Sequence, residues 1–264
     1  MTADTILHRL HENGRIRPNA PAYHEKIGDH WVPTTWGEYV AQVRQAAKSL
    51  IALGVEPGGS VNILGFNRPE WVIMDLAAML VSATATGIYT TNSPAECKYI
   101  IEHSEASVIL LEDDGQWQKI KQVRDDIDCL KHVVMMRGTS IDDDMALDWE
   151  AFMAKGSDVP DSQIDDLLAS LKLDQLCTLI YTSGTTGPPK GVMLSHENLA
   201  WTAKQGVDLL NITADDSLLS YLPLSHIAEQ VFTIHAAITA GYRVYFAESG
   251  LKVPDNLQEV QPHI

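Results

Sequence analysis

The sequence predicts an α/β fold in which mostly parallel sheets carry helices on both faces. Strand-like and helix-like patterns alternate along most of the chain, and capping-box spacings mark the starts of two helices. A parallel pair of strands needs a crossover connection, which such helices supply. With 264 residues and 45% hydrophobic composition, the chain can form one large domain or two smaller ones with a substantial core.

The first part of the chain gives clear element signals. Thr35 and Glu38 have capping-box spacing and precede an apolar helical face that ends at Gly54. Ser93 and Glu96 repeat the spacing before a second helix. The other elements expected up to residue 136 are strands at 60–66, 107–112 and 132–136, a helix at 71–80 introduced by Pro69, and helix-like residues at 115–124.

The pattern loosens between residues 137 and 173, where acidic runs flank short helical candidates around Trp149 and Leu168. We therefore expect a first α/β subdomain at 1–140, a connector at 141–173, and a partial second α/β subdomain at 174–264. In this last part we expect a helix at 197–210, a strand at 217–222, a helix at 225–240 stopped by Gly241, and a strand at 242–247.

Charge and cysteine usage narrow the class of protein. A formal net charge of −16 argues against a nucleic-acid surface, which normally shows basic clustering. Cys97, Cys129 and Cys177 are scattered and lack Cys-x-x-Cys pairing, which favours a reducing, cytoplasmic setting. The first ten residues carry charges throughout and show no secretion signal.

The most apolar region, residues 71–89, is interrupted by Asp75 and turns β-like near its end. It predicts a buried helix followed by a strand, with no transmembrane segment. Peripheral association with a membrane remains open.

One loop carries the most specific chemical signal, at residues 182–190. Gly184 and Gly187 free backbone amides to close around phosphate oxygens, and Lys190 adds positive charge. Hydroxyl groups in the same loop can donate hydrogen bonds to phosphate. The hydroxyls belong to Thr182, Ser183, Thr185 and Thr186, and Pro188 and Pro189 complete the segment.

This loop differs from the strand-loop-helix phosphate motif, which needs Gly before and Ser or Thr after its lysine. Here Pro189 precedes Lys190 and Gly191 follows it. Because residues 192–195 are apolar and β-prone, we expect the loop to join two strands in a hairpin-like arrangement. A turn without a ligand is the plainer alternative, although a turn does not need so many hydroxyls and glycines.

The segment at 181–192, Tyr-Thr-Ser-Gly-Thr-Thr-Gly-Pro-Pro-Lys-Gly-Val, resembles the signature loop of the adenylate-forming, AMP-binding superfamily. Tyr-Leu-Pro-Leu-Ser-His-Ile-Ala-Glu-Gln at 221–230 resembles the next motif, in the form found in long-chain fatty acyl-CoA synthetases of the bubblegum-type branch. Segments 62–71, 87–89 and 99–105 also resemble that branch, so the resemblance covers nearly the whole chain.

The resemblance implies an AMP-forming acid-thiol ligase in fatty acid metabolism, with ATP, a fatty acid and CoA as substrates and Mg²⁺ as cofactor. Thr182 to Lys190 would hold the β- and γ-phosphates, with the Thr182 hydroxyl oriented toward the magnesium. Lys190 and His226 are the candidate catalytic residues, His226 next to the acyl carboxylate or adenylate. Glu229, three residues further on, is expected to support His226 without touching substrate.

Three later parts of the family pattern are not found: a Tyr-Gly-x-Thr-Glu motif, a Thr-Gly-Asp motif, and a C-terminal lid with its lysine. We therefore expect an incomplete N-terminal domain of an acyl-CoA synthetase-like fold that is inactive in isolation. The alternatives are a ligase for aryl or medium-chain acids, or a noncatalytic nucleotide-binding module.

Overall fold

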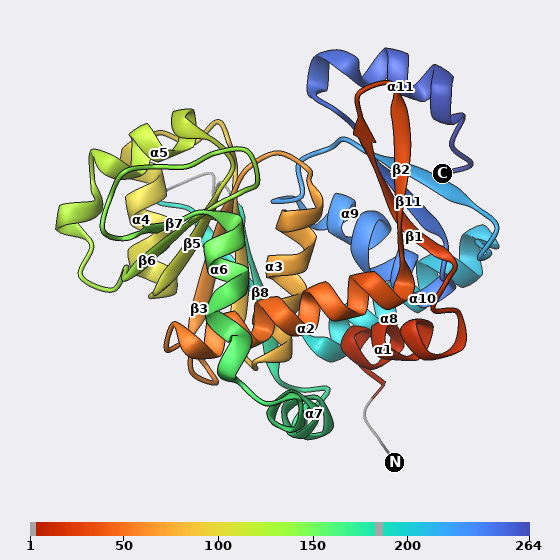
Figure 1. The fold of residues 1–264 in the computed structure, drawn as a ribbon, viewed down its shortest axis with the longest axis horizontal. Coiled ribbons are helices and arrows are strands. Elements are labelled where there is room, and N and C mark those ends of the chain that lie inside the picture. The colour runs from red at the N-terminus through yellow and green to blue at the C-terminus, as the bar shows by residue number, and fades with distance from the viewer. Residues whose placement is uncertain (1–3, 183–186) are drawn as a thin grey trace.

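The computed structural model describes residues 4–182 and 187–264, whose strands form two sheets (Figure 1). The larger sheet has seven strands in the order β7-β6-β5-β3-β4-β8-β9, and the smaller has four in the order β10-β11-β1-β2. Most strand pairs are parallel, and helices lie on both faces of the larger sheet, which confirms the predicted α/β class.

The larger sheet follows the predicted alternation. Every neighbouring pair in it is parallel except β8 and β9, which are antiparallel. Its strands are β3 (Ser60–Leu64), β4 (Thr84–Ile88), β5 (Val108–Leu111), β6 (His132–Met135), β7 (Ala146–Leu147), β8 (Leu176–Thr182) and β9 (Lys190–Ser195).

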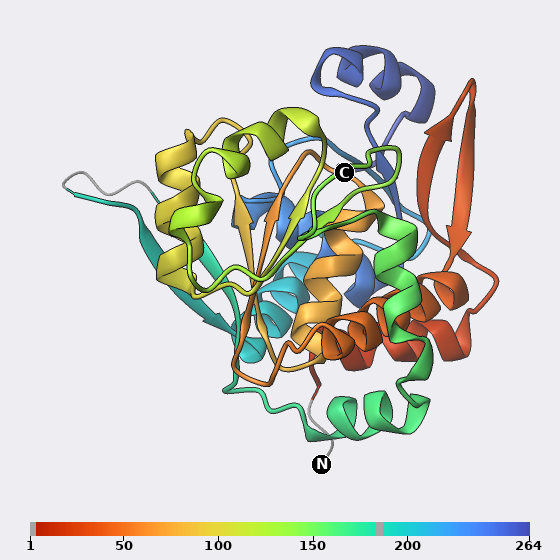
Figure 2. The same cartoon turned by 60° about the vertical axis from the view of Figure 1, so that its left-hand side comes forward.

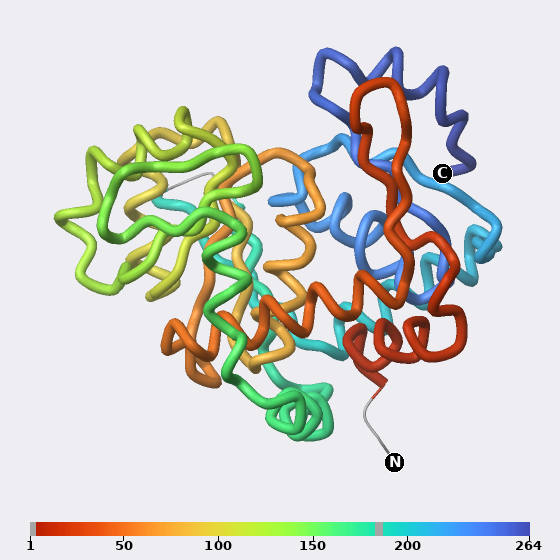
Figure 3. Tube along the Cα trace, in the orientation of Figure 1, coloured from red at the N-terminus to blue at the C-terminus, as the bar shows by residue number. Residues whose placement is uncertain are grey.

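The smaller sheet brings together two distant parts of the sequence. The hairpin of β1 (Pro21–Ile27) and β2 (His30–Thr35) lies beside β11 (Arg243–Phe246), which pairs in turn with β10 (Ser217–Ser220). Figure 3 shows this early hairpin running next to the last segments of the chain. Sequence analysis missed the hairpin because Pro33 and the charged residues of 21–35 weaken the strand pattern, and an edge strand such as β2 tolerates proline.

The capped helices begin where their spacing predicted. Both predicted capping boxes form, with Thr35 and Ser93 as N-caps of α2 and α4. The helices are α1 (Ile6–Ile16), α2 (Trp36–Ala52), α3 (Pro69–Leu80), α4 (Pro94–Ser104), α5 (Asp114–Lys121), α6 (Trp149–Lys155), α7 (Asp161–Ser170), α8 (His196–Leu210) and α11 (Val253–Val260), with 3₁₀ turns η1 (Arg124–Asp126), η2 (Gly156–Asp158) and η4 (Gly250–Lys252).

The expected single helix at 225–240 is divided. It begins at α9 (Ile227–Gln230), widens into a π-helix, η3 (Val231–Ala236), and returns to α-helix in α10 (Ala237–Ala240). The Phe232 carbonyl accepts a hydrogen bond from the Tyr242 hydroxyl, so this carbonyl has a partner outside the helix. A π-segment adds a residue to the turn, which local sequence patterns do not reveal.

Helix α3 is buried along its whole length, as the apolar run at 71–80 predicted. Figure 1 places it between the larger sheet and the segment around α9. One apolar cluster includes α2, α3 and residues of both sheets, and a second lies between the larger sheet and helices α4 and α5. Within the described residues, no helix is both long and apolar enough for a transmembrane span.

The predicted boundaries at residues 140 and 173 remain a prediction. Strand pairing does not follow them, since β1 and β2 join the sheet of β10 and β11, whereas β8 and β9 join the sheet of β3 to β7. The segment expected to be a connector contributes β7 to the larger sheet and packs α6 against α2.

Candidate functional site

The signature loop joins the two antiparallel strands β8 and β9, as predicted. Thr182 and Lys190 are partners in the register, and both side chains are exposed. Gly187 has a φ of +93°, a conformation that side chains other than glycine rarely adopt. The predicted phosphate ligands Ser183, Gly184, Thr185 and Thr186 lie outside the described residues. The arms of the hairpin thus present one hydroxyl and one ammonium group side by side.

Helix α4 lies beside this hairpin (Figure 2). The Tyr99 hydroxyl donates to the Pro189 carbonyl over 2.9 Å, and His103 Nδ1 is 2.7 Å from the Tyr181 hydroxyl. Sequence analysis assigned no role to either α4 residue. Their four-residue spacing, which places them on one helix face, was the available signal.

His226 follows β10 and is the N-cap of α9. Its Nδ1 accepts a hydrogen bond of 3.1 Å from the Ala228 amide, and its side chain is exposed. An acceptor at Nδ1 carries no proton, so any proton on the neutral ring is at Nε2, which the capping contact leaves available. The ring can orient a bound group without being a general base.

Glu229, expected to support His226, is buried at the centre of a polar cluster. Its Oε1 accepts hydrogen bonds from Ser220 and Thr233, each 2.8 Å long, and from the Tyr221 amide over 3.2 Å. Asn67, from the segment after β3, contributes a further contact at 3.3 Å. Burial raises the pKa of Glu229 above its usual value, and hydrogen bonds to its carboxylate oppose that shift.

These contacts connect the His226 segment to both sheets. Ser220 ends β10 in the smaller sheet, whereas Asn67 follows β3 in the larger one. Gly87 of β4 also packs closely against Ser225. A Cβ added at Gly87 would lie only 2.7 Å from Ser225 Cα. Sequence analysis named neither Asn67 nor Ser225 as part of the site, because such approaches depend on tertiary packing.

The two predicted motifs therefore follow strands of different sheets, and β4 lies next to both motifs. Thr182 ends β8, which pairs with β4, and β4 touches the segment just before His226 through Gly87. Both motifs follow the carboxyl ends of parallel strands, the edge at which open α/β sheets bind ligands.

A pocket of about 240 Å³ lies between the sheets at the same edge. It is bordered by Asn67 and Arg68 after β3, by Glu112 after β5, and by Ala247 after β11. Burial raises the pKa of Glu112, whose carboxylate accepts the Phe66 amide over 2.7 Å. This pocket therefore contains acidic as well as basic groups.

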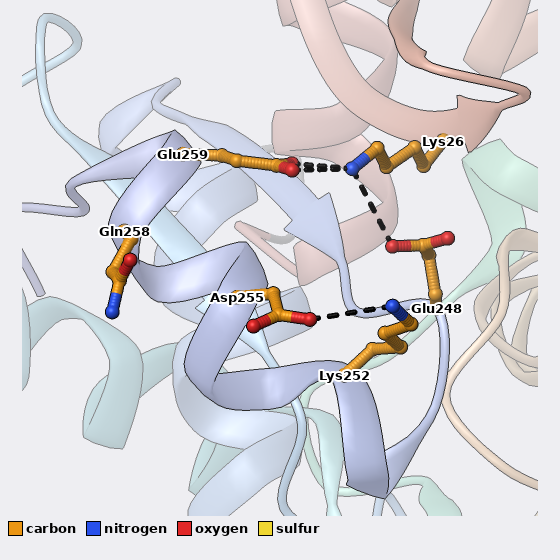
Figure 4. Close-up of a pocket in the computed structure, with 6 residues that line it drawn as sticks. All are labelled: Lys26, Glu248, Lys252, Asp255, Gln258 and Glu259. Atoms are coloured by element: carbon orange, nitrogen blue, oxygen red, sulfur yellow. Dashed lines mark hydrogen bonds and ion pairs between the residues drawn. The ribbon is translucent and has the colours of Figure 1, made fainter.

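A larger pocket of about 340 Å³ lies by α11, away from both motifs (Figure 4). Lys26 pairs with Glu259 at 2.5 Å and with Glu248 at 3.6 Å, and Lys252 pairs with Asp255 at 3.3 Å. Because its carboxylates outnumber and engage its lysines, this pocket does not suit a triphosphate.

The architecture and motifs agree with comparisons to known proteins. The chain belongs to the AMP-binding enzyme family, whose model matches residues 10–264. It is 44% identical over 250 residues to long-chain-fatty-acid–CoA ligase ACSBG2 of Xenopus laevis and 40% identical over 249 residues to human ACSBG2. These alignments cover 90% and 92% of this chain but 33% and 37% of the relatives, about a third of their length. The predicted likeness to the bubblegum-type branch is confirmed.

Solved structures show the same fold. A putative long-chain-fatty-acid CoA ligase from Rhodopseudomonas palustris gives a TM-score of 0.82 at 20% identity, covering 98% of this chain and 62% of that one. The N-terminal domain of FACL13 from Mycobacterium tuberculosis, bound to an inhibitor, gives 0.81 at 23% identity, covering 99% and 62%. At these identities the likeness is one of fold.

Proposed function

We propose that this chain is the N-terminal, ATP-binding portion of a long-chain fatty acid–CoA ligase. In that reaction a carboxylate oxygen attacks the α-phosphorus of ATP, the α–β phosphoanhydride bond breaks, and pyrophosphate leaves. The CoA thiol then displaces AMP from the acyl-adenylate and forms the thioester. The observation that carries the proposal is the exposed β8–β9 hairpin, with Thr182 opposite Lys190, in a member of the AMP-binding enzyme family.

Lys190 is the proposed partner of the departing pyrophosphate. Negative charge grows on the leaving oxygens, and a fixed ammonium group stabilises it better than mobile water does. Its position directly opposite Thr182 lets one phosphate group meet both side chains. Residues 183–187 would add amide and hydroxyl donors, a role that rests on their sequence.

Magnesium would arrive with ATP. The described residues contain no cluster of three or more His, Cys, Asp or Glu side chains suited to a metal, which fits a cation held mainly by phosphate oxygens. Thr182 is exposed and has the oxygen chemistry that Mg²⁺ prefers, so it remains the proposed protein ligand. When bound, the ion neutralises phosphate charge.

His226 is proposed to orient the acyl carboxylate or the adenylate. Its exposed ring is fixed by the Ala228 amide, and the Glu229 cluster fixes the turn on which it sits. We also propose a cytoplasmic location and a role in lipid metabolism, with peripheral contact to membranes as a source of fatty acid. The free thiols of Cys97, Cys129 and Cys177 fit a reducing compartment.

Pyrophosphate release from ATP and palmitate, with Mg²⁺ and CoA, tests the proposal when this chain forms the N-terminal portion of a complete ligase. Lys190→Ala should lower any turnover about a hundredfold or more, as loss of one donor to a developing anion does. Lys204→Ala is the matched control, because Lys204 is an exposed lysine of α8 that pairs only with Asp208 at 2.5 Å among the described residues. Equal rates for Lys190→Ala and the parent would refute the assignment.

The same assay separates the alternatives. Faster turnover of benzoate or octanoate than of palmitate would favour an aryl- or medium-chain acid ligase. MgATP binding without turnover of any acid, even in the complete protein, would favour a noncatalytic nucleotide-binding module.

A further inference from the structure

The β8–β9 hairpin receives contacts from outside its own sheet. Among the described residues, strand β9 is an edge strand that pairs only with β8, and its Val192 and Met193 side chains are exposed. An edge of this kind has hydrogen-bond partners on one side only. Contacts from outside the sheet can therefore add to the β8–β9 pairing that sets Thr182 opposite Lys190.

Helix α4 supplies contacts to both arms. On the β8 arm, the Tyr181 hydroxyl meets His103 Nδ1 at 2.7 Å. On the β9 arm, the Pro189 carbonyl accepts the Tyr99 hydroxyl at 2.9 Å. Tyr181 immediately precedes Thr182, and Pro189 immediately precedes Lys190. Each anchored residue is thus the chain neighbour of a proposed phosphate contact.

The rings of Tyr99, His103 and Tyr181 form a series of contacts from α4 to the hairpin, which we call the anchor. The Tyr99 and His103 rings stack with centroids 5.4 Å apart, and the His103 and Tyr181 rings meet edge to face at 5.7 Å. The Tyr181 ring also packs against Gly191 on the β9 arm. A Cβ added at Gly191 would lie 3.3 Å from this ring. Such aromatic pairs add to the stability gained from burial alone.

The helix that carries the anchor is itself fixed. A capping box closes its first turn, and Cys97, Ile100 and Ile101 are buried in the apolar cluster on that face of the larger sheet. Tyr181 belongs to the same cluster. Burial raises its pKa to about 12, so its hydroxyl keeps the proton needed for hydrogen bonding at neutral pH.

We propose that Tyr99 and His103 are positioning residues that fix both arms of the hairpin and so hold Thr182 and Lys190 at the separation that the β- and γ-phosphates need. The inference rests on the proposed function, because it assigns α4 a role in binding the pyrophosphate end of ATP. Neither side chain is required to touch the nucleotide.

The test compares the affinities of this chain for MgATP and for AMP by calorimetry. Tyr99→Phe removes only the hydroxyl, and His103→Leu removes the ring nitrogens. Each should weaken MgATP binding about three- to tenfold, the effect of one hydrogen bond, because the phosphate contacts lose their fixed spacing. AMP lacks the β- and γ-phosphates, so its affinity should stay within about twofold.

Two further variants separate positioning from a general structural effect. His103→Asn places an amide oxygen at the same number of bonds from Cα as Nδ1, so it should restore MgATP affinity. Glu102→Gln, an exposed change on the same helix, should leave both affinities unchanged. Equal weakening of MgATP and AMP, or no weakening of either, would overturn the inference.

Hydrogen exchange without nucleotide provides an independent measurement. Amides of residues 190–195 should exchange faster in Tyr99→Phe and His103→Leu than in the parent, because the edge strand loses its anchor. If the parent binds MgATP and the variants match it, the inference alone fails. If the parent binds no MgATP, the proposed function fails, and a rise in exchange would then show an anchor without a phosphate role.

Discussion

The two sheets differ in how the chain builds them. All strands of the larger sheet come from residues 60–195, and its parallel strands are separated by helices or turns of the same stretch. The smaller sheet joins residues 21–35 to residues 217–246. Local patterns describe the first kind of sheet well, whereas the second exists only when distant segments meet. The contact of Glu229 with Asn67 is of the second kind, because the two residues are 162 positions apart in the chain.

The largest effect is expected at Asp75 on α3, between the sheets. Both carboxyl oxygens are buried without a hydrogen-bond partner among the described residues, and burial raises the pKa from 3.8 to about 8. Between these values the folded state binds one proton more than the unfolded state, so stability falls as pH rises from about 4 to about 8. By pH 7 the loss in the free energy of unfolding is about 4 kcal/mol, because each pH unit above 3.8 costs about 1.4 kcal/mol.

Asp75→Leu should therefore raise the free energy of unfolding at pH 7 and flatten its pH dependence, measured by urea unfolding at pH 5 and pH 8. Asp75→Asn is the matched control, because it removes the ionisation while keeping an unpaired polar group. If the pH slope of Asp75→Leu equals that of the parent, Asp75 is not the group responsible.

The next effect is expected at Glu70, which belongs to an ion cluster that joins the sheets. Its fully buried carboxylate contacts Arg137 Nε at 2.7 Å and Arg68 Nη2 at 2.9 Å, and Arg137 reaches Glu25 of β1 at 2.6 Å. Glu70→Ala should lower the free energy of unfolding by about 3 kcal/mol, toward the low end for a broken buried pair because Arg137 is partly exposed. Lys204→Ala breaks an exposed pair and should change it by less than about 1 kcal/mol. Similar losses in the two variants would contradict this comparison.

A smaller effect is expected at Gly87, where β4 meets the His226 segment. The added methyl group of Gly87→Ala would lie 2.7 Å from Ser225 Cα and 2.9 Å from Trp71 Cζ2, so the backbone of one segment must move. We expect a loss of about 1–3 kcal/mol, typical of overpacking, measured by urea unfolding. Gly206→Ala, with open space around its added Cβ on α8, is the control and should not destabilise the chain.

The smallest change in stability is expected at the N-cap of α4, which depends only on neighbouring residues. Ser93→Ala removes the N-cap of α4 and should lower stability by about 1 kcal/mol in urea unfolding. Because α4 also anchors the hairpin, hydrogen exchange at residues 190–195 should rise slightly. A loss larger than that of Glu70→Ala would reverse the order of local and long-range contributions proposed here.

The candidate site was predictable to the extent that its signals are local. The hairpin around the signature loop followed from Pro189, Lys190 and the β-prone residues after them, and this prediction is confirmed. The roles of Lys190 and His226 in catalysis remain predictions. Sequence analysis did not assign Tyr99, His103 or Asn67 to the site, because their partners lie 78 to 162 residues away in the chain.

The alternation of strands and helices, the capped starts of α2 and α4, and the hairpin that carries Lys190 could be predicted from the sequence, because each depends on residues within a few positions of one another. Three features became visible only in the folded chain: β1 joins β11, Glu229 binds Ser220 of β10 and Asn67 after β3, and α4 contacts the hairpin. The two groups differ because a capping bond or a turn satisfies backbone groups locally. A buried carboxylate or an edge strand must instead find its partners wherever packing brings them.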